Sequence, residues 1–99
     1  MSQCRSSGVK TASSAIFSGQ CRLVSVHAVL TGTATTTIKV FDNSSAASGT
    51  ELTRLIVKPS PDAPSIIEFD MHGVLAVNGL YLSISSGAGE GAAVSVEFN

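Results

Sequence analysis

Three residues near the end of the chain have the spacing of a nucleotide-binding turn. Gly87, Gly89 and Ala92 fit the pattern G-x-G-x-x-A, in which a strand turns into a helix beneath a pyrophosphate. That chemistry needs a helix whose amide groups face the phosphate, and an acidic residue about 20 positions later. Only AAVSVEFN follows, and it alternates like a strand. We therefore interpret SGAGEG as a hairpin loop and expect no nucleotide cofactor.

Histidine and serine residues offer a second possible chemistry, nucleophilic catalysis. A catalytic triad needs a base beside a hydroxyl and a third group that orients the base. Serine is so abundant here that some serine near His27 or His72 is expected by chance, and no G-x-S-x-G elbow is present. His27 lies opposite Val26 and Ala28 on an expected strand, which is typical of a solvent-facing or interface histidine. We therefore expect no enzyme activity.

A third possibility is a metal site formed by Glu68, Asp70 and His72. Period two places the three side chains on one strand face, where they could bind an ion. Carboxylates that alternate with apolar residues are also typical of a solvent-facing strand, and we favour that interpretation. Cys4 and Cys21 lack zinc-site spacing, so we expect two reduced thiols in preference to a disulfide. The sequence thus predicts neither a metal nor another cofactor.

Composition limits the kinds of partner that the protein can have. The chain has 99 residues, enough for one domain with one hydrophobic core. Charged residues make up 13% of it, against about 25% in an ordinary globular protein. Because interface cores are depleted in Lys, Glu and Asp, this suits a subunit whose faces are covered by neighbours. The net charge is −1 and the six Lys and Arg residues are scattered, so we expect no nucleic-acid partner.

Hydropathy gives no sign of membrane insertion or export. No apolar run approaches the roughly 20 residues that span a bilayer. The N-terminal sequence MSQCRSSGVKTASSAIF contains two basic residues but no apolar stretch of the length found in a signal peptide. We therefore expect no membrane partner and no export by a cleaved signal.

Alternation of apolar and polar residues predicts strands along most of the chain. It is found in CRLVSVHAVL, TTTIKVFD, SIIEFDM, LYLSISS and AAVSVEFN, and no helical stretch of convincing length occurs. Asn78-Gly79 predicts a hairpin, because both central positions of a type I′ turn need positive φ. Pro59, Pro61 and Pro64 predict a long loop. We expect an all-β fold, an antiparallel, jelly-roll-like β-sandwich of roughly seven to eight short strands.

The N-terminal segment differs from the remainder in lacking a sustained period. We expect residues 1–13 to form a flexible arm and residues 14–99 to form a single β-sandwich domain. The arm has two possible positions. It lies across a neighbouring subunit, or it pairs as the first strand of its own sandwich.

Several segments of the sequence resemble those of a known protein family. The order IKVFDNSSAASGTEL, a proline-containing loop, GVLAVNGLYLSI, a glycine-rich turn and AVSVEF resembles small virion-associated proteins of tailed bacteriophages. The matching phrases are residues 40–42, 48–50 and 78–81, and the resemblance covers approximately residues 20–98.

The resemblance implies a non-enzymatic component of the virion. We expect a capsid decoration or cement protein, commonly a homotrimer, that binds the major capsid protein on the capsid surface after assembly in the host cytoplasm. The alternative is a carbohydrate-binding or receptor-facing module of a head fibre or tail, although the chain has no Trp and only one Tyr to stack on a sugar ring. Val9, Ile16, Phe17 and Tyr81 are the candidate interface residues.

Overall fold

All regular structure in the described part of the chain is β. The computed structural model describes residues 5–59, 66–85 and 87–99, and none of these lies in a helix that could span a membrane. The strands are β1 (Arg5–Ser6), β2 (Ser14–Ser18), β3 (Cys21–Leu30), β4 (Thr36–Asp42), β5 (Thr50–Val57), β6 (Ile66–Ala76), β7 (Gly79–Ile84) and β8 (Ala92–Phe98). The all-β prediction is therefore confirmed.

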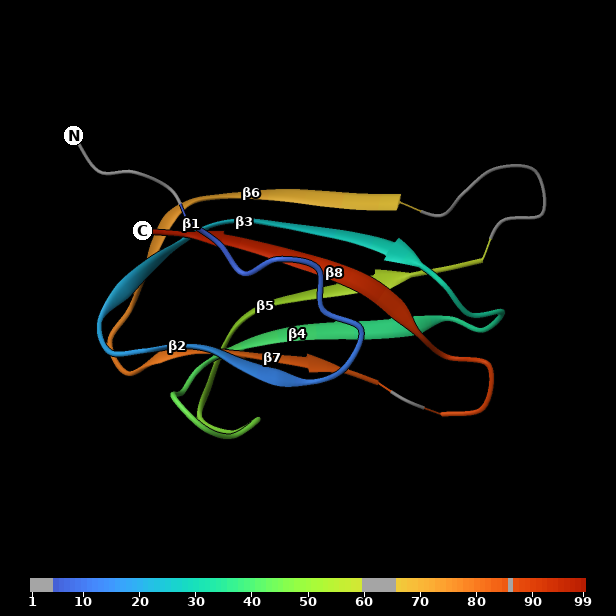
Figure 1. Cartoon of the computed structure of the whole chain (residues 1–99), viewed down its shortest axis with the longest axis horizontal. Helices are drawn as coiled ribbons and strands as arrows, with labels where there is room; N and C mark the ends of the chain where they lie inside the picture. Colours follow the sequence, from blue (N-terminus) through green and yellow to red (C-terminus); the bar gives the residue numbers. More distant parts are fainter. Residues whose placement is uncertain (1–4, 60–65, 86) are drawn as a thin grey trace.

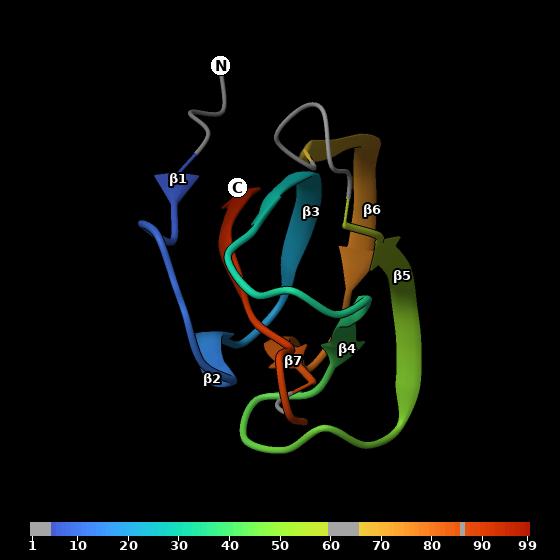
Figure 2. The ribbon, with the colours of Figure 1, turned by 90° about the vertical axis from the view of Figure 1, so that its right-hand side faces the viewer.

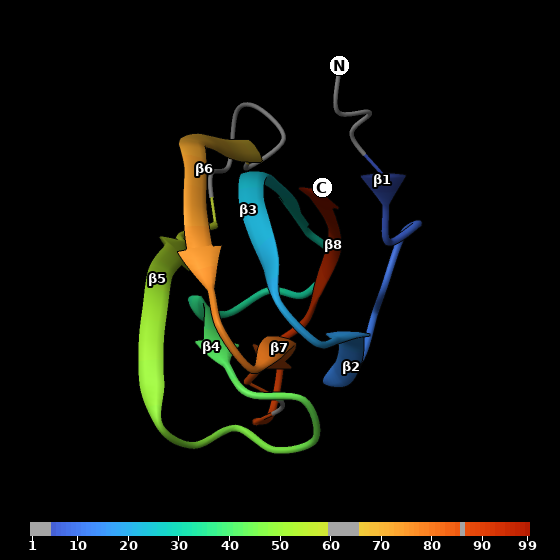
Figure 3. The same ribbon diagram turned by 90° about the vertical axis from the view of Figure 1, so that its left-hand side faces the viewer.

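The strands form two four-stranded antiparallel sheets that pack face to face (Figure 1). Sheet A has the order β1-β8-β3-β6, and sheet B has the order β2-β7-β4-β5. Viewed from either end, β5 and β6 lie along one side of the sandwich and β1 and β2 along the other (Figure 2, Figure 3). The predicted sandwich is thus present, with two open sides.

The pairing of the strands is that of a jelly roll. β1 pairs with β8, β2 with β7, β3 with β6, and β4 with β5, as if one long hairpin were folded at the β4–β5 turn and then rolled up. Rolling adds the β3–β8 and β4–β7 pairs, which complete each sheet. Eight strands in two sheets joined this way define the double-sheet jelly roll.

The core lies between the sheets and is made by the alternate apolar residues that the sequence indicates. Leu80, Leu82 and Ile84 of β7 face Val94, Val96 and Phe98 of β8 across the sandwich. Strands β3, β4 and β5 add further buried apolar residues, among them Leu23, Val26, Ala28, Ile38, Val40, Leu55 and Val57. Strands β3, β4, β5, β7 and β8 therefore each contribute an apolar face to the core, and their polar face turns outward.

Two predicted hairpins are wrong, because the chain changes sheets at both turns. Asn78-Gly79 connects β6 of sheet A to β7 of sheet B, and Gly79 alone of the two residues has positive φ. The glycine-rich loop likewise connects β7 of sheet B to β8 of sheet A. In that loop the Gly89 carbonyl accepts hydrogen bonds from the amides of Thr33 and Ala34, at 2.7 and 2.8 Å. The loop leads into a strand, as predicted, and its described residues, 85 and 87–91, do not form the helix that a pyrophosphate site requires.

Two irregularities interrupt the ladder between β3 and β6. The register shifts between Leu23 and Ser25, so that Leu23 and Val26 both face the core. On β6, His72 and Gly73 both have positive φ, +54° and +77°, which bends the strand. The bent strand β6 therefore contains both apolar runs of this region, IIEFDM before the bend and GVLA after it.

The described part of the N-terminal segment takes the second of its two possible positions. Arg5 and Ser6 pair with Phe98 and Glu97 of β8, and Lys10 pairs with Val94. The segment thus forms the outer edge of sheet A in its own sandwich. Cys4, Pro61 and Pro64 lie outside the described residues, whereas Pro59 follows β5 outside any strand.

Candidate functional site

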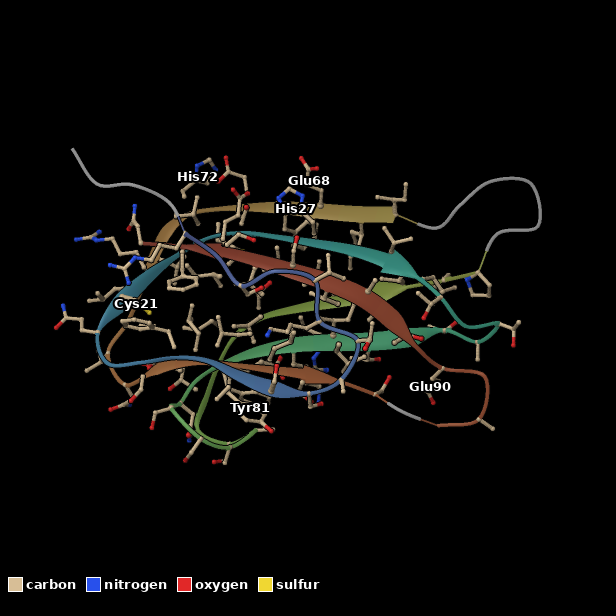
Figure 4. All side chains as sticks on the ribbon, viewed as in Figure 1. Cys21, His27, Glu68, His72, Tyr81 and Glu90 are labelled. Atoms are coloured by element: carbon tan, nitrogen blue, oxygen red, sulfur yellow. The ribbon has the colours of Figure 1, made fainter. Side chains whose placement is uncertain are left out.

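The outer face of sheet A carries His27 and three of the seven acidic residues of the protein, Glu68, Asp70 and Glu97. Alternation turns Ser25 and His27 of β3 outward, and the register sets His27 opposite Glu68 of β6. Ser25 lies opposite Asp70 on one side and Glu97 of β8 on the other. Figure 4 shows His27 and Glu68 together on this outer face, above the sandwich. Three strands far apart in sequence therefore meet at one histidine.

The His27 ring bridges the two neighbouring strands. Its Nδ1 lies 3.0 Å from Glu68 Oε2, and its Nε2 lies 2.9 Å from Glu97 Oε1. The Ser25 hydroxyl donates to the same oxygen of Glu97. We call these four side chains the His27 clamp.

The electrostatics of the clamp favour the charged forms of His27 and Glu97. The hydrogen bond to Glu97 raises the pKa of His27; partial burial opposes this, and Glu68 adds to it. The Ser25 hydroxyl, and then His27, lower the pKa of Glu97. The raised pKa of His27 favours the imidazolium, in which both ring nitrogens carry a proton and each donates to one carboxylate.

The clamp has the residue types of a catalytic triad but a different arrangement of protons. Ser25 Oγ lies 3.2 Å from His27 Nε2, and Glu68 lies at Nδ1, as in a Ser-His-Glu triad. A general base needs a free lone pair on Nε2, whereas Glu97 accepts a hydrogen bond from that atom. Ser25 is buried and donates its own proton to Glu97. In this geometry His27 links three strands, and Nε2 lies nearer to Glu97 than to the Ser25 hydroxyl.

The three residues considered for a metal site do not converge. Glu68 contacts His27, whereas Asp70 accepts a hydrogen bond from the backbone amide of His72 at 2.9 Å. The His72 ring, in the bend of β6, lies 3.6 Å from Asp70 and is largely exposed. Over residues 5–59, 66–85 and 87–99, no three His, Cys, Asp or Glu side chains are grouped as ligands for a metal ion.

The predicted interface residues fall into two groups. Val9 is 70% exposed, beside the edge of sheet A. Tyr81 is on the outer face of sheet B, opposite Ala15 on β2 and Phe41 on β4, and its ring points away from the core (Figure 4). Ile16 and Phe17 instead pack against the core.

The burial of Phe17 has a direct structural reason. Its ring centroid lies 5.4 Å from that of Phe98, and the Arg5 guanidinium lies over the Phe17 ring, 5.8 Å from the centroid. The three side chains close the β1–β2 side of the sandwich, where the sheets would otherwise be open. Ile16 and Phe17 thus stabilise their own domain, which leaves Val9 and Tyr81 as the accessible candidates.

The outer face of sheet B carries a smaller charged group. The Arg54 Nε lies 3.0 Å from Glu51 Oε2, and Lys39 Nζ lies 3.9 Å from Glu51 Oε1. The hydrogen bond from Arg54 lowers the pKa of Glu51; burial opposes this, and Lys39 adds a smaller lowering effect. Exposed pairs of this kind contribute little to stability. The two outer faces therefore differ in character, acidic on sheet A and slightly basic on sheet B.

Two small clefts lie at opposite ends of the sandwich. One, of about 280 Å³, is lined by Thr11, Ser13, Ser85 and Glu90 among others. The other, of similar volume, lies beside Cys21, whose thiol has a pKa raised by burial and further by the negative charge of Asp42. A raised pKa keeps this thiol protonated and unreactive at neutral pH.

Comparison with known proteins adds no family to this description. The chain matches no protein-family model, no curated protein and no solved structure at a significant level.

Proposed function

We propose that the chain is a non-enzymatic structural protein of a bacteriophage virion. In this role it decorates the capsid and stabilises the head by binding the major capsid protein across neighbouring subunits. The observation that carries the proposal is the strand order β1-β8-β3-β6 and β2-β7-β4-β5. Double-sheet jelly rolls of this kind recur in viral capsid proteins and in lectins. The scarcity of charged residues, 13% of the chain, supports a surface made for contact with other subunits.

Stabilisation by such a protein follows from mass action. A protein that bridges two adjacent capsid subunits binds the assembled shell better than separated subunits, so it shifts the assembly equilibrium toward the shell. A homotrimer strengthens this effect, because after one copy has docked the others bind at a high effective concentration. The candidate contacts are Val9 at the edge of sheet A and Tyr81 on sheet B.

The proposal is tested on heads assembled without this protein. Adding the purified chain should raise the temperature at which such heads disassemble, and sedimentation at two concentrations should give a constant trimer mass. Val9→Asp and Tyr81→Ala should weaken co-sedimentation with heads, whereas Ser83→Ala, on the same strand face as Tyr81, should leave it unchanged. Heads whose disassembly temperature is unaffected by the protein would refute the proposal, and a monomer would refute its trimeric form.

The alternative, a carbohydrate-binding module of a head fibre or tail, has one observation in its favour. The cleft beside Thr11, Ser13, Ser85 and Glu90 presents hydroxyl groups and a carboxylate, the groups that bind sugar hydroxyls. The Ser13 hydroxyl already donates to the Ile84 carbonyl and Ser85 Oγ accepts from the Thr37 amide, so part of the hydrogen-bonding capacity of the cleft is in use. A glycan that shifts the NMR signals of Glu90 and its neighbours would favour this alternative.

A further inference from the structure

Strand β6 is the outer strand of sheet A on the side of the sandwich where β5 ends sheet B (Figure 2, Figure 3). Within the described residues, no strand pairs with the side of β6 that faces away from β3. Every second residue of an edge strand points its N–H and C=O groups away from the sheet, so the edge can accept another strand. From Ile66 to Met71 the strand is regular, and the bend at His72 and Gly73 ends this stretch.

The side chains of this stretch have a definite chemistry on each face. Glu68 and Asp70 point outward, with side chains 69% and 68% exposed. Phe69 points to the opposite face and remains 41% exposed, because β5 covers that side only in part. The His27 clamp holds Glu68, and the His72 amide holds Asp70. An added strand would therefore meet two fixed carboxylates on one face and an apolar ring on the other.

A second copy of this chain fits the edge poorly. Antiparallel pairing of two β6 strands centred on Phe69 sets Glu68 of each copy directly opposite Asp70 of the other. Centring the pair on Glu68 or Asp70 sets a carboxylate opposite its own copy. Like charges that lie directly opposite each other destabilise a strand pair. The edge is thus protected against self-association and is complementary to a basic strand.

We propose that residues 66–71 of β6 are a docking site for an extended segment of a partner protein in which Lys or Arg alternates with apolar residues. The backbone of the segment continues sheet A, its cations face Glu68 and Asp70, and its apolar side chains cover Phe69. In strand addition of this kind, main-chain hydrogen bonds supply affinity and alternate side chains supply specificity. The proposal concerns the chemistry of the partner segment and does not require the partner to be a capsid protein.

The probe is a synthetic peptide of seven residues in which lysine alternates with valine. Titrated into the full-length chain, it should shift the NMR signals of residues 66–71 most and should slow hydrogen exchange there. The double variant Glu68→Gln/Asp70→Asn should raise the Kd about 2- to 30-fold, the range for losing two cross-strand charge pairs. Glu90→Gln, which removes a carboxylate from the loop before β8, is the matched control and should leave the Kd unchanged.

Backbone pairing is tested with two N-methylated forms of the same peptide. One carries the methyl groups on its lysines and the other on its valines, so only one form blocks the amides that would face β6. Loss of binding with one form alone supports the proposal. Equal binding by both forms, shifts centred on sheet B or an absence of binding overturns it. A dimer that protects residues 66–71 without peptide also overturns it, in favour of a second copy. These results do not depend on whether the protein binds heads.

Discussion

Replacing His27 by glutamine should destabilise the fold by an amount that depends on pH. The ring contributes two ion pairs whose members are between about one third and two thirds exposed. Exposed pairs are each worth about 0.2–1 kcal/mol, so His27→Gln should lower the free energy of unfolding by about 0.5–2 kcal/mol when all three groups are charged. The loss is modest because water already screens the clamp.

The pH window follows from the direction of each pKa shift. The pKa of His27 is raised above its ordinary value of 6.5, so its contribution is complete below that value and is lost as the pH rises through the folded-state pKa. The pKa of Glu97 is lowered from 4.5, so its contribution is present above 4.5 and is lost as the pH falls through its folded-state pKa. The clamp should therefore stabilise the protein most between these two ordinary values.

The loss of unfolding free energy caused by His27→Gln is measured by urea unfolding of the wild type and the variant, at about pH 5.5 and at about pH 9. The effect of the substitution should be largest at the lower pH and should shrink in high salt. His72→Gln is the matched control, because the His72 ring is largely exposed and lies no closer than 3.6 Å to Asp70. Equal losses at both pH values, or equal losses in both variants, would refute the assignment of the clamp.

Three further predictions concern the framework. Leu82→Ala, at a fully buried position, should lower the free energy of unfolding by about 2–5 kcal/mol in urea, whereas Ser83→Ala on the outer face should change it by less than about 0.5 kcal/mol. Deleting residues 1–13 should lower the Tm, because β8 then loses one of its two partner strands; an unchanged Tm would show that this segment does not hold the sheet edge. Gly79→Ala should cost more than about 1 kcal/mol in the same urea assay, since the residue has φ +145° and an added Cβ would collide with the Phe17 carbonyl; a wild-type midpoint would contradict this.

The faces of the strands could be predicted from the sequence because alternation is a local property. Leu80, Leu82 and Ile84 face the core as their spacing indicates, and so do Val94 and Val96. The destinations of the turns could not be predicted in this way. Asparagine and glycine at 78 and 79 show that the chain bends, but the bend fits both a hairpin and a passage between sheets. The positions of the apolar partners across the sandwich decide between the two.

The candidate site was predictable only in part, for the same reason. His27 and Glu68 both lie on polar strand faces that alternation identifies, so each could be marked as an outward residue. Glu97 is 70 positions from His27 in the chain, and only the register between β3 and β8 brings them within 2.9 Å. Such a register depends on how the whole roll closes, which no short stretch of sequence specifies.

The nested pairing of the strands also determines when the protein can fold. β4 and β5 are joined by residues 43–49 alone, whereas the pair formed by Arg5 and Phe98 joins residues near the two ends of the chain. Because closing a longer loop costs more entropy, we expect the β4–β5 hairpin to form first and the outer pairs to follow slowly. β8 lies between β1 and β3, so during synthesis sheet A stays incomplete until Ala92–Phe98 has left the ribosome. The domain therefore folds after translation of its last strand, when its apolar faces have already been exposed to the cell.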